Sequence, residues 1–170
     1  MKKIKVLILG KSNVGKSSLI NYLSNKHSAL VSNKLHTTRI STLHLAEHND
    51  FYMELIDTPG ISVSDTNLLS KAMKSNASKY ITSADIIILL TQPQENYNYE
   101  IKIKDKIKEC GKRYILCINK IDLNSHGEYK DNLFKSLGKN EACYISVKES
   151  IGIESLYTLI KEKIDSKFFN

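Results

Sequence analysis

The sequence has 170 residues, of which 41% are hydrophobic and 25% are charged, and it contains only seven glycines and two prolines. This length supports one hydrophobic core of ordinary size, and the composition is typical of a globular protein rather than a disordered, collagen-like or disulfide-rich one. We therefore expect one domain over residues 1–170. The net charge of +7 suits a polyanion such as RNA, but the lysines are scattered, which favours solvated helix surfaces instead.

Targeting signals and cysteine pairs are not evident in the sequence. The longest apolar run lies within residues 84–90, far short of the roughly 20 residues that a membrane-spanning helix needs. The N-terminal apolar run stops at Leu9 without a small-residue cleavage site, which favours a first strand in a cytoplasmic protein over a signal peptide. Cys110, Cys117 and Cys143 form no CxxC pair and predict neither a disulfide framework nor a zinc site. We expect Cys117 to lie in a strand core.

Strand and helix patterns alternate along the chain, and a turn signal between two of the strands predicts a hairpin. In chain order the expected elements are strand 3–9, helix 17–25, strand 40–47, strand 51–57, helix 67–80, strand 84–92, helix 101–110, strand 113–119, helix 128–137, strand 142–146 and helix 153–164. In the helix over residues 101–110, the spacing places Ile103, Ile107 and Cys110 on one face. Because several strands are apolar throughout, the pattern predicts an α/β fold with a mostly parallel six-stranded sheet and helices on both faces.

The segment GKSNVGKS, residues 10–17, matches G-x-x-x-x-G-K-[ST] between a predicted strand and a predicted helix, where this phosphate-binding loop occurs. Its glycines allow successive backbone N–H groups to point at phosphate oxygens, and the start of the helix adds a positive dipole. We expect Lys16 to reach the β and γ phosphates and the Ser17 hydroxyl to ligate Mg²⁺. The alternative is a chance match in a strand-turn-helix connection.

The segment DTPG, residues 57–60, ends a predicted strand at the edge where open α/β sheets bind ligands. Asp57 is therefore expected to hold Mg²⁺ through water, and the Gly60 N–H to contact a γ phosphate. Taken alone, this tetrapeptide is also an ordinary type I or type II turn. Its position after a phosphate-binding loop favours the functional interpretation.

The segment NKID, residues 119–122, follows another apolar strand and predicts guanine recognition. Asp122 has acceptors for the guanine N1–H and exocyclic amino group, Asn119 can bridge loops and meet the other edge of the base, and the Lys120 stem can cover the ring. A site built on such hydrogen bonds rejects a base lacking them by roughly 10⁴-fold or more. The segment SVK, residues 146–148, would contact the guanine oxygen through its backbone. An exposed polar loop is the alternative for NKID alone.

With TTR at residues 37–39, these segments resemble the five motifs of translation-factor-related bacterial GTPases of the Era and TrmE group. Residues 32–42 are most similar to Era, and the resemblance runs from about residue 3 to residue 164. It implies a Ras-like P-loop G domain that switches between GDP and GTP forms. It also implies that Thr38 closes on Mg²⁺ and the γ phosphate, the alternative being an ordinary surface hydroxyl.

Two positions bear on the mechanism. Ile61 stands where Ras-type proteins carry the glutamine that orients the attacking water, a role that isoleucine cannot fill. The resemblance implies that Asn13 coordinates a potassium ion near the phosphates, whose charge would stabilise the transition state; the alternative is an Asn13 side chain in water.

The RNA-binding KH domain that follows the GTPase half of Era is absent from this sequence, so we expect either a minimal GTPase or an isolated G domain.

The expected function is that of a GTPase switch that hydrolyses GTP to GDP and phosphate, with a nucleotide-gated partner-binding module of little hydrolysis as the alternative. The resemblance implies ribosomal RNA or a ribosome-assembly factor as partner. A nucleotide-dependent dimer is also expected. The expected catalytic residues are Lys16, Thr38, Gly60 and Asn13. The expected nucleotide-binding residues are Asn13, Val14, Gly15, Lys16, Ser17, Ser18, Asp57, Asn119, Lys120, Asp122, Ser146, Val147 and Lys148. The expected Mg²⁺ ligands are Ser17, Thr38 and Asp57.

Overall fold

A computed structural model describes residues 2–25, 42–49, 51–57, 78–123 and 142–165, and a six-stranded sheet forms its centre. The strands are β1 (Lys2–Leu9), β2 (Thr42–His48), β3 (Phe51–Asp57), β4 (Ile86–Thr91), β5 (Tyr114–Ile118) and β6 (Ala142–Tyr144). Their order is β2-β3-β1-β4-β5-β6, and all neighbours pair in parallel except the antiparallel hairpin of β2 and β3. The predicted fold class and the predicted hairpin are confirmed.

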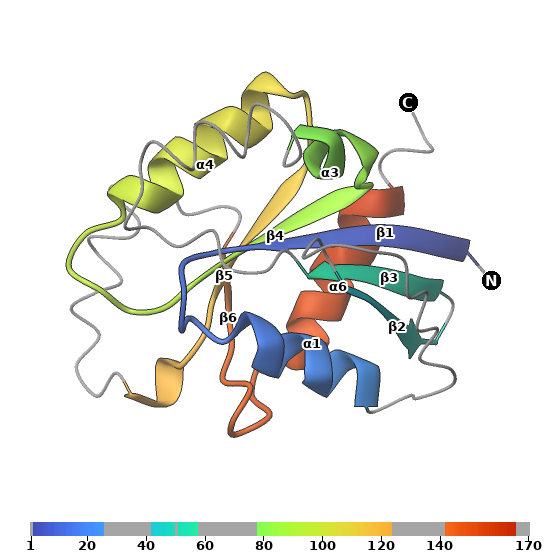
Figure 1. Cartoon of the computed structure of the whole chain (residues 1–170). Helices are drawn as coiled ribbons and strands as arrows, with labels where there is room; N and C mark the ends of the chain where they lie inside the picture. Colours follow the sequence, from blue (N-terminus) through green and yellow to red (C-terminus); the bar gives the residue numbers. More distant parts are fainter. Residues whose placement is uncertain (1, 26–41, 50, 58–77, 124–141, 166–170) are drawn as a thin grey trace.

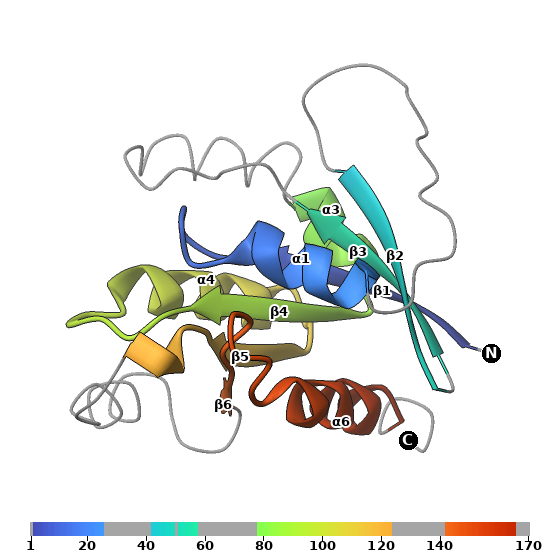
Figure 2. The same cartoon turned by 90° about the horizontal axis from the view of Figure 1, so that it is seen from below.

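Helices cover both faces of this sheet (Figures 1 and 2). The described helices are α1 (Lys16–Asn25), α3 (Ser78–Ser83), α4 (Asn98–Glu109) and α6 (Ile153–Asp165), with a short 3₁₀ turn, η2 (Ile121–Leu123). Side chains of α1 and α6 pack into one buried cluster with the sheet, and those of α3 and α4 pack into a second cluster on the opposite face. The sheet therefore separates two apolar cores.

The apolar runs of the central strands follow from this burial on both faces. In β1, Val6 and Ile8 face the cluster of α1 and α6, whereas Leu7 and Leu9 face the cluster of α3 and α4. All residues of β4 and of β5 are buried, so neither strand shows a polar face. Cys117 of β5 is fully buried, as predicted.

The helix predicted over residues 101–110 differs from the structure at both ends. It begins three residues earlier, at Asn98, and ends at Glu109, so Cys110 is its C-cap. The prediction that Cys110 lies on the apolar face with Ile103 and Ile107 is wrong, because the chain leaves the helix there and the thiol is exposed. The helix predicted over residues 128–137 lies outside the described residues.

The parallel strands all end at one edge of the sheet, where the candidate motifs follow them. The last residues of β1 and β3 are Leu9 and Asp57, and β4 ends at Thr91. Pairing continues one residue further, since the Asn119 N–H donates to the Thr91 carbonyl at 2.8 Å and the Ile145 N–H to that of Ile118 at 2.8 Å. The pairing of the sheet therefore reaches the first residues of the segments that follow β5 and β6.

Among the helices that the structure describes, none combines the length and the apolar character needed to cross a membrane.

The two-sided burial of β5 leads to a stability prediction. Ile115→Ala removes a side chain with 0% exposure and should lower the free energy of unfolding by about 2–5 kcal/mol, through lost burial and the cavity left behind. Ile151→Ala, at a site that is 49% exposed, should change it by less than about 0.5 kcal/mol. Urea unfolding followed by circular dichroism measures both, and equal losses would contradict the description of the core.

Candidate functional site

The loop between β1 and α1 wraps around the Lys16 ammonium. Lys16 is the first residue of α1, and its Nζ donates to the carbonyl oxygens of Gly10 at 2.8 Å and Lys11 at 2.7 Å. Burial lowers the pKa of Lys16 below its usual value, and the nearby Asp57 carboxylate partly offsets this effect. The loop thus fixes a cation at the positive end of a helix, which is an arrangement suited to phosphate oxygens.

The shape of this loop requires glycine at position 15. Gly15 has a φ of 101°, and a Cβ atom there would lie 2.3 Å from Nδ2 of Asn119. Asn13 also has a positive φ, 66°, which asparagine tolerates better than most residues. The loop consequently packs directly against the segment that follows β5.

Asn119 connects three segments of the site. Its side chain is buried, its Nδ2 donates to the Val14 carbonyl at 3.0 Å, and its Oδ1 accepts from the Val147 N–H at 3.1 Å. Its own backbone N–H is bound to Thr91 at the end of β4. One amide side chain therefore joins the phosphate-type loop to the SVK segment.

Asp122 and Lys120 lie on either side of this junction. The Ser146 hydroxyl donates to Oδ1 of Asp122 at 2.6 Å and accepts from the Glu149 N–H at 3.2 Å, which holds an exposed carboxylate in place. Lys120 has a φ of 62°, and its Nζ donates to the Asn13 carbonyl. This role of the Ser146 side chain has no signal in the sequence, because serine after a short strand is common.

Hydroxyl and carboxylate oxygens suited to Mg²⁺ lie at the phosphate end. Ser17 is exposed in the first turn of α1, and Asp57 is half-buried at the end of β3, paired in register with Ile8 of β1. Oxygen donors of these types are those that Mg²⁺ prefers beside substrate phosphates. Ser18 and Lys148 are exposed, whereas the expected site residues Thr38 and Gly60 lie outside the described residues.

Four polar residues in or beside the phosphate-type loop have no role assigned by the motifs: Lys11, which lies in the loop, and Thr91, Gln94 and Glu100. The carboxylate of Glu100 is buried with 0% exposure and accepts hydrogen bonds from Thr91 and Gln94. The one sequence signal is its place on the apolar face of α4, three residues before the buried Ile103.

Comparison with known proteins identifies the family. Residues 5–120 match the family described as 50S ribosome-binding GTPase, which covers more than half of the chain. The chain belongs to the 50S ribosome-binding GTPase family. The expected resemblance to Era-type P-loop GTPases is thereby confirmed.

Relatives of this GTPase domain include proteins named GTPase Der. The Der protein of Bartonella bacilliformis is 31% identical over 98% of this chain, and that of Nautilia profundicola is 36% identical over 96%. The chain spans 36% of the length of each, about a third of these curated relatives.

Solved structures of GTPases share the fold. Era of Aquifex aeolicus bound to GDP·AlF4⁻ superimposes with a TM-score of 0.74 at 29% identity, covering 96% of this chain and 57% of that one. Era in complex with MgGDPNP and a fragment of 16S ribosomal RNA gives a TM-score of 0.72 at 28% identity, with the same coverage. The G domain of the T. maritima FeoB iron transporter gives 0.69 at 26% identity, covering 95% and 98%.

The environment of Lys16 predicts an unusual titration. Because burial penalises the ammonium, Lys16 should lose its proton at a lower pH than the ordinary value of 10.5. Exposed Lys106 is the matched control, since its hydrogen bond to Glu109 raises its pKa and should delay deprotonation. NMR titration of the ¹⁵Nζ resonances measures both, and a Lys16 midpoint at or above that of Lys106 would contradict the described loop.

Proposed function

We propose that this chain binds Mg-GTP at the carboxyl edge of its sheet and hydrolyses it to GDP and phosphate as a molecular switch. The observation that carries the proposal is the Asn119 side chain, which joins the Val14 carbonyl to the Val147 N–H. Through it, a loop suited to phosphate and segments suited to guanine become parts of one site.

In this proposal the phosphate half holds the triphosphate and the metal. Lys16 contacts the β and γ phosphates, and backbone N–H groups of residues 13–18 line the loop around them. Mg²⁺, when bound, would neutralise charge on the β and γ phosphates, with Ser17 and Asp57 as ligands. Thr38 and Gly60 are the proposed residues that respond to the γ phosphate.

The base half reads guanine. The Asp122 carboxylate accepts from N1–H and the exocyclic amino group, and its exposed position beside Ser146 supports this role. Lys120 extends its stem over the ring, and its Nζ donates to the Asn13 carbonyl. The backbone of residues 146–148 meets the guanine oxygen, so adenine lacks its matching contacts.

Hydrolysis in this site relies on position and charge rather than on a side-chain base. A water molecule attacks the γ phosphorus, the bond to the bridging oxygen breaks, and charge accumulates on the β–γ bridge beside Lys16. We propose that a potassium ion adds positive charge there, with the exposed Asn13 side chain among its ligands.

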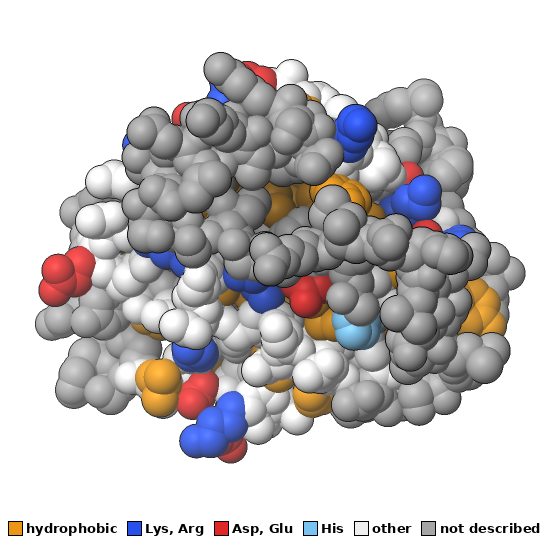
Figure 3. Space-filling view, viewed as in Figure 1, with side chains coloured by type: hydrophobic (Ala, Val, Ile, Leu, Met, Phe, Trp, Pro, Cys, Tyr) orange, Lys and Arg blue, Asp and Glu red, His pale blue; other side chains and the backbone are white. Residues whose placement is uncertain are grey.

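The proposed partner is ribosomal RNA or a ribosome-assembly particle, and the proposed setting is the cytoplasm. Similarity to Era, solved with a 16S ribosomal RNA fragment, supports the partner. The net charge of +7 is compatible with RNA, but Figure 3 shows basic and acidic side chains interspersed on one face. We therefore assign RNA contacts to no described surface, and we propose a nucleotide-dependent dimer by family resemblance alone.

Base specificity tests the proposal directly. Purified protein should bind Mg-GTP and release phosphate, whereas Asp122→Asn should weaken GTP binding by roughly 10²-fold or more and favour xanthosine triphosphate, whose N1–C2 edge pairs with an amide. Fluorescent-nucleotide titration and a phosphate-release assay measure both. Unchanged guanine preference in the variant would overturn the assignment of Asp122, and GTP binding without turnover would favour the nucleotide-gated binding module.

The cation proposal has a separate test. Phosphate release should be faster in potassium than in sodium buffer of equal ionic strength, because sodium is smaller and fits a potassium site poorly. Asn13→Ala should remove most of this difference while Mg-GDP affinity changes much less. Equal rates in the two salts for the unaltered protein would show that no potassium ion takes part.

A further inference from the structure

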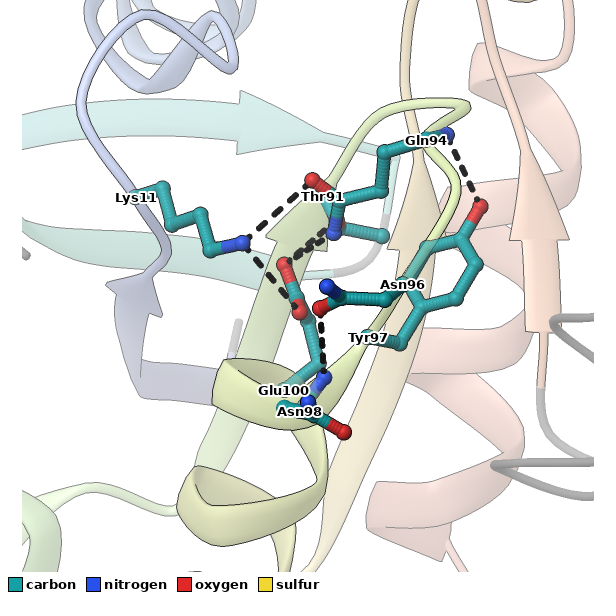
Figure 4. Close-up of polar contacts among 7 residues, drawn as sticks. All are labelled: Lys11, Thr91, Gln94, Asn96, Tyr97, Asn98 and Glu100. Atoms are coloured by element: carbon teal, nitrogen blue, oxygen red, sulfur yellow. Dashed lines mark hydrogen bonds and ion pairs between the residues drawn. The ribbon is translucent and has the colours of Figure 1, made fainter.

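Glu100 is a fully buried carboxylate beside the proposed nucleotide site. It lies in the first turn of α4 with 0% exposure, and its Oε1 accepts from the Thr91 hydroxyl at 2.7 Å and from Nε2 of Gln94 at 2.8 Å (Figure 4). Its Oε2 accepts no hydrogen bond from any residue that the structure describes. Burying a charge without a partner costs folding free energy. The role of Glu100 therefore depends on the cation that lies near it.

That cation is Lys11, the second residue of the phosphate-binding loop. Its Nζ lies 3.9 Å from Oε2 of Glu100 and donates to Oε1 of Gln94 at 3.4 Å (Figure 4). It also lies 5.7 Å from the centre of the Tyr99 ring. Since the Lys11 side chain is only 24% exposed, the attraction to Glu100 is weakly screened by water.

Lys11 connects this buried charge to the cation that faces the phosphates. Its carbonyl oxygen accepts from Nζ of Lys16 at 2.7 Å, while its side chain reaches Glu100. Thr91, which binds the same carboxylate, lies at the end of the buried strand β4, and its carbonyl holds the Asn119 N–H. The Glu100 carboxylate is thus held in place by a hydrogen bond from the end of β4, and it attracts the Lys11 ammonium of the loop.

We propose that Glu100 is a positioning residue that acts through Lys11 to hold the phosphate-binding loop, and with it Lys16, in the geometry that binds the β phosphate. This inference rests on the proposed nucleotide-binding function. It assigns the pair to the phosphate half, because Lys11 binds Nζ of Lys16 through its carbonyl, whereas the Ser146 hydroxyl binds the carboxylate of Asp122. Replacing a whole buried ion pair often costs little folding stability, whereas removing one partner leaves an unpaired buried charge, so the test compares the single variants with the double variant.

The test uses Lys11→Met and Glu100→Gln, which keep side-chain size and remove the charge attraction. Each should weaken Mg-GDP affinity about tenfold, and the double variant should lose little more than either alone, since both changes break one interaction. Lys11→Arg keeps the cation and should stay within about twofold of the unaltered protein. The matched controls Lys106→Met and Glu109→Gln break an exposed pair on α4 and should leave affinity unchanged.

The ratio of GDP to IDP affinity separates positioning of the phosphates from general damage. IDP lacks the exocyclic amino group that Asp122 reads, so the ratio should stay constant in both variants although both affinities fall. A change in the ratio of GDP to IDP affinity in either variant would overturn the inference. So would a double variant whose loss of affinity equals the sum of the two single losses. If Glu100→Gln does not fold, the affinity of Lys11→Met alone tests the inference, because Lys11 lies in the loop between β1 and α1.

The reference measurement on the unaltered protein keeps the two proposals distinguishable. Absence of Mg-GDP binding there would overturn the proposed function and this inference with it. Normal affinity in the unaltered protein and in both variants would overturn this inference alone.

Discussion

The amide of Asn119 is the contact on which the geometry of the site depends. It is buried, and its two hydrogen bonds fix the Val14 carbonyl on one side and the Val147 N–H on the other. A side chain with both a donor and an acceptor can satisfy two different backbone groups at once, and no aliphatic residue can do so. This amide occupies the space that a Cβ atom at position 15 would need, so the conformation of the loop and the position of the amide constrain each other.

Two charged groups near this junction, Lys16 and Glu100, are held by hydrogen bonds. The Lys16 ammonium is bound by the carbonyls of Gly10 and Lys11, and Glu100 is bound by Thr91 and Gln94. The loop after β1 is far in the sequence from the other two segments, the end of β4 and the start of α4. The low local dielectric strengthens each contact and makes the loss of any one costly.

The order of elements and the location of the site follow from local sequence patterns, whereas the buried polar contacts do not. The apolar runs of β4 and β5 predict strands covered on both faces, and the motifs after β1, β3 and β5 must then meet at one edge. Helix ends are less certain: α4 begins at Asn98 because Tyr99 and Glu100 are buried against the sheet, although their polar groups interrupt the apolar pattern. The contact of Glu100 with Lys11 and that of the Ser146 hydroxyl with Asp122 depend on the three-dimensional approach of distant segments, which no periodicity encodes.

The backbone at Asn13 and Lys120 shows how the two halves of the site stabilise each other. Both residues are non-glycine residues with positive φ, 66° and 62°, a conformation that costs of order 1 kcal/mol or more at each. Such strain persists only where surrounding contacts determine the conformation, and here Nζ of Lys120 donates to the Asn13 carbonyl. The strained residue of the loop after β1 is thus bonded to the strained residue of the segment after β5. Binding free energy is then not spent on ordering these loops separately, so a ligand that contacts both halves gains affinity from their fixed relative position.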